Sequence, residues 1–530
     1  MSERRWWSDG VIYQIYPRSF ADSDGDGHGD LQGVIDHLDH LAWLGVDGIW
    51  LNPINPSPNA DWGYDVSDYQ AVAEDFGGLD ALDRLVSEAE VRGIRTVLDI
   101  VPNHTSDRHP WFVDARSSRS AAHRDWYVWA DPKPDGSPPN NWRSLLTGDP
   151  AWTLDERTGQ FYLHNFVAEQ PDLNWWNEDV RLAFDDILRF WFDRGIAGFR
   201  IDVAQGMVKD PALRDNPEAT EDDHPSLREH GLRLEYNMNR PEVHDVLRRW
   251  RSIADGYGPD RVLMGETGVY DTGALMRFYG VGSDELHLAL NFLVVFAPFG
   301  DATRALVEAS EALMPPGAWP VWTGSNHDVG RFPTRWCGGD ERKIRVALLT
   351  LLTLRGTPLL YYGDEIGMPE VDVPRERLLD PMGVRGWPRN PGRDRGRTPM
   401  RWTSEPGAGF TRPDVEPWLP LGDVGPGDSV ADQMADPGSF LHLCRDLIAL
   451  RKVRPDLVDG AYEGSPAPEG VWAWRRGTGT IVAVNTSERA AELDVPHGTV
   501  LIGTSRVRDG DPVAGRLELG PWEGVILSVG

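Results

Sequence analysis

Short apolar runs alternate with amphipathic segments along most of the chain. Runs rich in β-branched residues predict buried strands, and apolar positions spaced three or four apart predict helices between them. The predicted strands are 11–15, 48–51, 96–101, 198–202, 262–266, 285–292, 319–323 and 357–361. Predicted helices include 31–44, 79–90, 183–194 and 241–254. Eight strands alternating with helices are typical of an α/β protein with a parallel (β/α)8 barrel, the TIM barrel.

Three segments depart from this alternation. Residues 104–174 are rich in Pro, Gly, Asn and aromatic residues, and loops of such length are usually functional. A second insertion, 369–397, follows the eighth strand, and beyond residue 455 short alternating runs separated by turns replace the helical spacing. We predict a barrel of residues 1–103 and 175–455, an inserted domain of 104–174 after the third strand, and a C-terminal β-sandwich domain of 456–530.

Composition narrows the classes of partner. The 530 residues carry a formal net charge of −30, which disfavours nucleic acid and anionic membrane surfaces. Cys337 and Cys444 are too few and too distant for a disulfide framework, and no CxxC motif occurs. The N-terminal residues lack the apolar core of a signal peptide, and no apolar run is long enough to span a bilayer. We expect a cytoplasmic protein with a small-molecule partner, either a monomer or a weak homo-oligomer.

An acidic, glycine-rich loop follows the first predicted strand. Residues 22–30 match the front of a calcium-binding loop, in which alternate carboxylates and a backbone carbonyl surround a hard cation. The glutamate expected at the twelfth position is replaced by Gly33, so an acidic turn without metal is the alternative. The residues expected to hold a structural Ca²⁺ or Mg²⁺ are Asp22, Asp24, Asp26, His28 and Asp30.

Charged and polar side chains gather at the ends of four predicted strands. They are His104 after the third strand, Arg200 and Asp202 on the fourth, Glu266 on the fifth, and His327 and Asp328 after the seventh. In a parallel barrel the C-terminal strand ends face one mouth, where active sites lie. A single position of this kind is commonly a rim ion pair, but four together indicate an active site.

The pair of Asp202 and Glu266 suits glycoside hydrolysis. Arg200 lies two residues before Asp202, so on a strand both side chains point the same way, and the guanidinium is expected to depress the pKa of the carboxyl. Asp202 is then a nucleophile, and Glu266 is a general acid and base, a role that requires a partly desolvated carboxyl. The alternative, a catalytic metal site, lacks the His-x-His or Glu-x-x-His spacing.

Five motifs together resemble the α-amylase superfamily of retaining glycoside hydrolases, and within it the oligo-1,6-glucosidase and α-glucosidase branch. They are Asp-Ile-Val-Pro-Asn-His at 99–104, Gln-Pro-Asp-Leu-Asn-Trp at 170–175, Gly-Phe-Arg-Ile-Asp at 198–202, Gly-Glu at 265–266 and Asn-His-Asp at 326–328. The resemblance runs essentially end to end and implies a carbohydrate substrate and no organic cofactor. It also implies that residues 22–30 are the metal loop that this branch often carries.

The resemblance also implies roles for individual residues. Asp202 is the implied nucleophile, Glu266 the acid/base, and Asp328 a third carboxylate that steadies the distorted sugar. The residues implied to bind the substrate are Asp61, Tyr64, His104, Phe166, Gln170, Arg200, His327 and Arg397.

Bond specificity and reaction outcome stay open. In this branch a valine after the nucleophile, here Val203, often accompanies action on α-1,6 linkages, although relatives with Asp-Val-Ala can prefer α-1,4 bonds. Segment 140–146 has leucines where relatives tend to have an aromatic residue, which leaves the acceptor side undefined. We expect an exo-acting α-glucosidase on terminal α-1,4 or α-1,6 bonds. The alternatives are an α-glucosyltransferase or a sucrose/trehalose isomerase; a non-catalytic scaffold is disfavoured because all three carboxylates are present.

Overall fold

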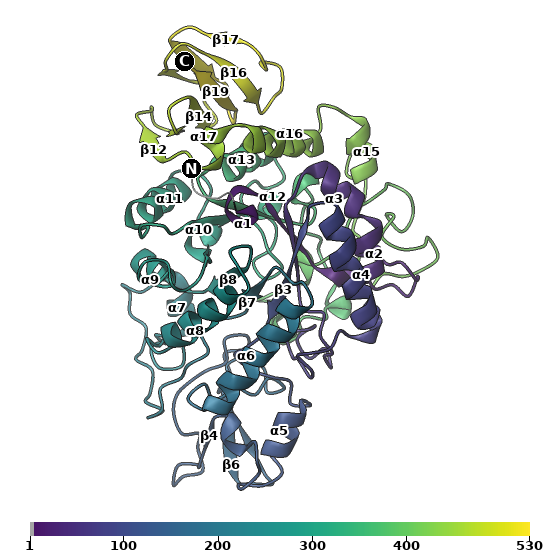
Figure 1. Cartoon of the computed structure of the whole chain (residues 1–530), viewed down its shortest axis with the longest axis vertical. Helices are drawn as coiled ribbons and strands as arrows, with labels where there is room; N and C mark the ends of the chain where they lie inside the picture. Colours follow the sequence, from purple (N-terminus) through teal and green to yellow (C-terminus); the bar gives the residue numbers. More distant parts are fainter. Residues whose placement is uncertain (1–4) are drawn as a thin grey trace.

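The computed structural model describes residues 5–530, and eight parallel strands close into a barrel at its centre (Figure 1). The strands are β1 (Ile12–Ile15), β2 (Gly48–Leu51), β3 (Arg95–Ile100), β7 (Gly198–Ile201), β8 (Val262–Thr267), β9 (Leu288–Asn291), β10 (Val321–Thr323) and β11 (Thr357–Tyr361). Each pairs with the next in chain order, and β11 pairs with β1. The predicted barrel is confirmed.

The sequences of these strands are almost continuously apolar, because both faces of each strand are buried. Inside the barrel, side chains such as Trp50, Met264 and Leu288 form one core, and the helices cover the outside. Two glycines allow the close packing next to the site. A β-carbon on Gly198 would lie 2.2 Å from the Val262 carbonyl oxygen, and one on Gly265 would lie 2.4 Å from a methyl group of Leu286.

Eight helices pack around the barrel. They are α2 (Leu31–Asp36), α3 (Leu38–Leu44), α4 (Gly78–Val91), α6 (Glu178–Asp193), α8 (Val243–Gly256), α11 (Asp301–Leu313), α13 (Glu341–Thr353) and α16 (Phe440–Val453). The prediction of one helix over 31–44 was wrong, because the chain breaks at His37, whose ring donates to the Gly33 carbonyl at 2.8 Å. Further short helices are α1 (Trp6–Asp9), α7 (Pro225–His230), α9 (Thr272–Arg277), α10 (Phe292–Phe296), α12 (Phe332–Arg335), α14 (Pro381–Gly386), α15 (Val430–Ala435) and α17 (Pro455–Val458).

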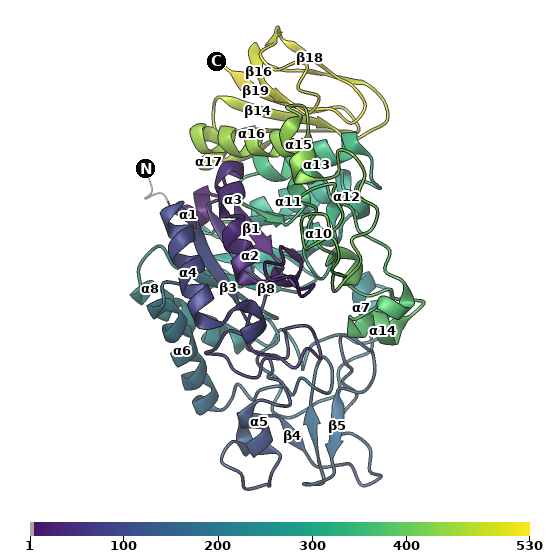
Figure 2. The same ribbon diagram turned by 90° about the vertical axis from the view of Figure 1, so that its right-hand side faces the viewer.

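The insertion after β3 lies at one end of the molecule, and the C-terminal strands lie at the other (Figures 1 and 2). The insertion forms a three-stranded antiparallel sheet in the order β4-β6-β5, with β4 (Trp129–Ala130), β5 (Trp152–Asp155) and β6 (Gln160–Leu163). Its helix α5 (Pro110–Ala115) places Phe112 against the rings of Trp129 and Tyr162.

The C-terminal part is all-β, as predicted. A six-stranded sheet has the order β12-β13-β14-β19-β16-β17, and β15 pairs with β18. The bounds are β12 (Tyr462–Ser465), β13 (Val471–Arg476), β14 (Thr480–Asn485), β15 (Ala491–Asp494), β16 (Gly498–Gly503), β17 (Pro512–Val513), β18 (Arg516–Leu519) and β19 (Gly524–Val529). Trp472 and Trp474 join the core shared with the barrel helices, whereas the alternate residues Val471 and Ala473 join a second core. The exact domain bounds stay a prediction.

Within residues 5–530 no helix is both long enough and apolar enough to cross a bilayer.

Candidate active site

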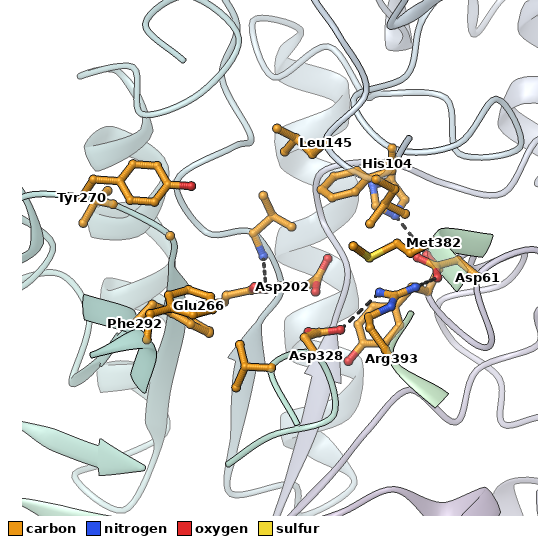
Figure 3. Close-up of a pocket in the computed structure, with 18 of the residues that line it drawn as sticks. Asp61, His104, Leu145, Asp202, Glu266, Tyr270, Phe292, Asp328, Met382 and Arg393 are labelled. Carbon is orange, nitrogen blue, oxygen red and sulfur yellow. Dashed lines mark hydrogen bonds and ion pairs between the residues drawn. The ribbon is translucent and has the colours of Figure 1, made fainter. Parts of the chain in front are cut away.

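The predicted catalytic carboxylates meet at the C-terminal mouth of the barrel and line one cavity of about 380 Å³ (Figure 3). Asp202 directly follows β7, Glu266 lies near the end of β8, and Asp328 lies in the turn after β10. Four of the predicted substrate-binding side chains line the same cavity: Asp61, Tyr64, His104 and Phe166. The strand ends thus build one site, as the barrel topology requires.

Arg200 holds two of these carboxylates together. Its Nη1 donates to Asp202 Oδ1 at 2.7 Å, and its Nη2 donates to Glu266 Oε2 at 2.6 Å. Nη1 also donates at 2.9 Å to Asp99 on β3, to which sequence reasoning assigned no role. Carboxyl groups bridged by one guanidinium are held at short range, as in retaining glycosidases, where they stand about 5–5.5 Å apart.

The backbone turns sharply at Val203, directly after the predicted nucleophile. Its φ of 44° is one that β-branched residues rarely adopt, and such strain costs about 1–3 kcal/mol. The turn aims the Val203 N–H at Glu266 Oε2, which accepts it at 2.9 Å. Since Glu266 Oε2 is fixed by two donors, Oε1 is the oxygen that can carry and pass a proton.

Arg200 lowers the pKa of Asp202, as expected, but the expected net depression was wrong. Burial, together with the charges of Glu266 and Asp99 on the same guanidinium, raises the pKa by more than Arg200 lowers it. Burial likewise raises the pKa of Asp99 to about 7. Asp202 therefore ionises only above the ordinary aspartate range, and three acidic groups compete for one cation.

Asp328 has the opposite electrostatic environment. Burial would raise its pKa, but His327, Arg393 and Arg397 lower the pKa overall, and the two arginines donate to Asp328 Oδ1 at 3.2 and 3.1 Å. Asp328 is therefore ionised at neutral pH. Such a fixed negative charge can stabilise a developing positive charge without exchanging a proton.

Arg393 lines the cavity beside Asp61 and Asp328, and sequence reasoning missed it. Its Nη2 donates to Asp61 and, at 2.6 Å, to Asp380, while its Nη1 donates to Asp328. Segment 385–397 carries five arginines, and nothing in the sequence singles out the one that enters the cavity. The choice follows from tertiary contacts, because buried carboxylates from separate loops converge on this one guanidinium.

The other predicted binding residues lie behind the cavity wall. Gln170, Arg200, His327 and Arg397 are all completely buried. Gln170 Nε2 lies 3.2 Å from Asp61 Oδ2 and 3.0 Å from His104 Nε2, and the Tyr64 ring stacks on His327 with a centroid distance of 5.3 Å. These contacts position the side chains that line the cavity, and direct contact of the buried residues with a sugar stays a prediction.

Part of the acidic loop forms a cluster that suits a cation. Carboxylate oxygens of Asp22, Asp24 and Asp30 lie within 4.8 Å of one another. Burial and the charge of Asp26 raise the pKa of Asp24, as expected where like charges gather. The Asp26 carboxylate lies outside this cluster and accepts the His28 backbone N–H. His28 stands at the loop position that supplies a backbone carbonyl, and its ring lies over Trp418. Three hard oxygen donors at this spacing fit Ca²⁺ or Mg²⁺.

Comparison with known proteins agrees with this arrangement. The family model for the α-amylase catalytic domain matches residues 14–460. The chain belongs to the α-amylase family.

Relatives and solved structures extend the similarity over nearly the whole chain. A probable α-glucosidase of Rhizobium meliloti is 41% identical over 509 residues, which cover 93% of this chain and 92% of that protein. An oligo-1,6-glucosidase of Heyndrickxia coagulans is 37% identical over 535 residues, covering 93% and 94%. The crystal structure of an α-glucosyl transfer enzyme superposes with a TM-score of 0.93 at 40% identity and covers 100% of both chains. The predicted family and its α-glucosidase branch are confirmed.

Proposed function

We propose that the protein is a retaining, exo-acting α-glucosidase that removes terminal glucose from short α-1,4- or α-1,6-linked oligosaccharides. The observation that carries this proposal is a cavity lined at one end by the Asp61–Arg393 ion pair and further out by two carboxylates that share one guanidinium. We infer that the ion pair closes its end of the cavity. A closed end admits one terminal sugar ring and excludes a continuing chain. The names of the relatives, α-glucosidase and oligo-1,6-glucosidase, support the same substrate class.

The reaction uses the two carboxylates in turn. Asp202 attacks the anomeric carbon while Glu266 gives a proton to the glycosidic oxygen, so the leaving group departs as a glucosyl ester forms on Asp202. Glu266 then removes a proton from water, and the water oxygen displaces Asp202 from the anomeric carbon. Each step inverts the configuration at the anomeric carbon, so the two steps together retain the original configuration. The charge of Asp328 stabilises the cationic sugar ring in both transition states.

A second candidate function keeps these steps and changes the acceptor. The α-glucosyl transfer enzyme that superposes over the whole chain favours an α-glucosyltransferase, and a sucrose or trehalose isomerase would need the same glucosyl ester. In that case a sugar or another alcohol, instead of water, displaces Asp202.

A substrate panel tests the proposal. The purified protein is incubated separately with maltose, isomaltose, sucrose, trehalose and starch, and all products are followed by chromatography over time. We expect free glucose from maltose or isomaltose, with the α-anomer formed first, and slow release from starch. New disaccharides with little free glucose would favour transfer or isomerisation, and internal cleavage of starch would contradict exo-action.

Arg393→Lys tests the closed end of the cavity. Lysine keeps the charge but loses the planar fork that serves Asp61, Asp328 and Asp380, so we expect kcat/KM for maltose to fall about 10–100-fold. The matched control, Arg389→Lys, changes an exposed arginine of the same segment and should leave kcat/KM unchanged. Equal activity of both variants would contradict a role for Arg393 in holding the terminal glucose.

We also propose that Asp22, Asp24 and Asp30 hold a structural Ca²⁺ or Mg²⁺, with the remainder of loop 22–30 around it. Chelation by EDTA should lower the thermal midpoint by a few degrees, and added Ca²⁺ or Mg²⁺ should restore it, because an ion that binds only the folded state stabilises it. Asp24→Asn should weaken this response, whereas the exposed Asp414→Asn should not. A thermal midpoint that changes neither with EDTA nor with added metal would contradict the site.

We further propose a cytoplasmic monomer or weak homo-oligomer that binds neither nucleic acid nor membranes. The net charge of −30 supports the absence of polyanionic partners. Light scattering coupled to size-exclusion chromatography tests the oligomeric state, and a stable larger assembly would contradict the proposal.

A further inference from the structure

A buried amide lies behind the wall of the catalytic cavity. Strand β1 reads Ile-Tyr-Gln-Ile, and its Gln14 is completely buried. Ile12 belongs to the core inside the barrel, so Gln14, two positions further along the strand, points into the same interior. An amide costs free energy in such a core unless it is hydrogen-bonded, so its partners indicate what it does there.

Gln14 belongs to a closed ring of four hydrogen-bonded side chains. Its Nε2 lies 2.8 Å from Asn52 Oδ1 and 2.8 Å from His327 Nδ1. Asn52 Nδ2 lies 2.8 Å from Tyr64 Oη, and His327 Nε2 lies 2.5 Å from the same oxygen. None of the four residues is more than 5% exposed, and Tyr64 is the member that lines the cavity.

Asp99 sets the direction of the hydrogen bonds in this ring. Both of its carboxylate oxygens accept from Arg200 Nη1, at 2.9 and 3.1 Å, and Oδ2 also accepts from the Tyr64 hydroxyl at 2.9 Å. Burial raises the pKa of Tyr64, which therefore keeps the proton that it donates. Since the Tyr64 hydrogen points to Asp99, the Tyr64 oxygen is an acceptor for both of its other neighbours, Asn52 and His327.

The directions propagate from Tyr64 to the imidazole of His327. Asn52 uses its amide nitrogen on Tyr64, so it presents its oxygen to Gln14, which must answer with its own amide nitrogen. An amide nitrogen only donates, so His327 Nδ1 accepts and the neutral ring carries its hydrogen on Nε2. That hydrogen lies between Tyr64 Oη, at 2.5 Å, and Asp328 Oδ2, at 3.1 Å.

We propose that Gln14 is a positioning residue for glucoside cleavage, because it fixes the tautomer of His327 whose Nε2–H holds Tyr64 and Asp328 in place. Both of these residues line the cavity, and Figure 3 shows Asp328 next to Arg393. With the hydrogen on Nδ1 instead, a bare Nε2 lone pair would face the Asp328 carboxylate and repel it. The role in cleavage rests on the proposed function, whereas the tautomer does not.

The surroundings of His327 also keep its ring neutral. Burial lowers the pKa of His327 well below the ordinary histidine range, the neighbouring arginines lower it further, and the charge of Asp328 opposes them. The titratable and charged groups that face the ring are Tyr16, Tyr64, Arg200, Asp328, Arg393 and Arg397.

Gln14→Glu should convert the fixed tautomer into one that depends on pH. While the new carboxyl group and His327 share one proton, Nε2 keeps its hydrogen whichever partner holds the shared proton. Once that proton is lost, the carboxylate accepts a hydrogen from Nδ1 and leaves Nε2 bare. We expect the ratio of kcat/KM for maltose, variant over wild type, to be highest in mild acid. Above the pKa of the pair the ratio should fall about tenfold per pH unit.

Two further variants separate this role from a purely structural one. Gln14→Met keeps the length of the side chain and removes the donor without adding a titratable group, so it should lower kcat/KM about tenfold at every pH. Gln433→Met removes another buried amide, which donates to the Ile366 carbonyl at 2.9 Å outside the cavity, and should leave kcat/KM unchanged. A Gln14→Glu ratio that is the same at every pH would overturn the role of Gln14 in fixing the tautomer.

Nitrogen NMR observes the tautomer directly in the wild-type protein labelled with ¹⁵N-histidine. The His327 resonances are those missing from His327→Asn, and we expect a protonated Nε2 and an unprotonated Nδ1 at pH 7. A hydrogen on Nδ1 at that pH would overturn the inference whatever the activity of the enzyme. Absence of hydrolysis with every glucoside would instead overturn the proposed function, and with it the role of Gln14 in cleavage, while the NMR result would still decide the tautomer.

Discussion

Asp202→Asn is expected to lower kcat/KM for 4-nitrophenyl α-glucoside by about 10⁴-fold or more while the protein stays folded. Asparagine keeps the size of the side chain but cannot form the glucosyl ester. Of the carboxylates that Arg200 binds, only Asp202 lies in the turn directly after β7. Initial rates measure the loss, and circular dichroism confirms the fold. Mass spectrometry of the wild-type protein trapped with a slow fluorinated donor should locate the adduct on Asp202. An adduct on another residue would contradict the assignment.

The same substitution should not lower stability. Burial and the neighbouring carboxylates raise the pKa of Asp202 in the folded protein, and Arg200 lowers it by less. An acid whose pKa is higher in the folded than in the unfolded state destabilises the fold at every pH above its unfolded pKa. Removing its charge should therefore raise the thermal midpoint at pH 7, and the gain should disappear well below pH 4. A lower midpoint at pH 7 would mean that the Arg200 pair outweighs the burial of Asp202.

Glu266→Gln is expected to lower kcat/KM for maltose by about 10²–10⁴-fold, and much less for α-glucosyl fluoride. Maltose needs a proton on its leaving oxygen, whereas fluoride departs without one. Because Glu266 also serves as the base for water, the glucosyl ester should then accumulate, as an initial burst of fluoride. An equal loss with both donors would contradict the role of Glu266 as the acid/base.

Azide separates the two roles by stereochemistry. In Glu266→Gln azide needs no base and attacks the ester on Asp202, so the expected product is α-glucosyl azide. In Asp202→Ala azide occupies the space of the missing carboxylate and attacks the donor directly, so the expected product is β-glucosyl azide. The conservative control is wild-type protein with azide, which should form glucose from the same donor. If Glu266→Gln gave β-glucosyl azide and Asp202→Ala gave α-glucosyl azide, the assignments of nucleophile and acid/base would have to be reversed.

The fold, and the meeting of the three proposed catalytic carboxylates at one mouth, could be predicted from local sequence. Each barrel strand is short, apolar and bounded by turn residues, and the chain order of such strands determines where their ends meet. Asp202, Glu266 and Asp328 belong to strand ends or to the turns that follow them, so the barrel topology alone brings them to one mouth. The resemblance to the α-amylase superfamily rests on the same contiguous motifs.

Features that depend on distant contacts could not be predicted. In the sequence Arg393 is one of five arginines in segment 385–397, and only the folded chain brings buried carboxylates to it. The pKa of Asp202 depends on how many acidic groups share Arg200, which is also a tertiary property. The acidic loop matches a metal motif by spacing, but only the folded chain shows which carboxylates gather, namely Asp22, Asp24 and Asp30, with Asp26 outside the cluster.

The amino-acid sequence by itself determined the barrel, its insertion, its C-terminal sheets and the three carboxylates, because strand periodicity and strand-end chemistry are local properties. Only the tertiary structure decided the charge balance around Arg200 and the placement of Arg393 between Asp61, Asp328 and Asp380. Electrostatic and hydrophobic environments are sums over neighbours from separate loops, and those neighbours are known only once the chain has folded.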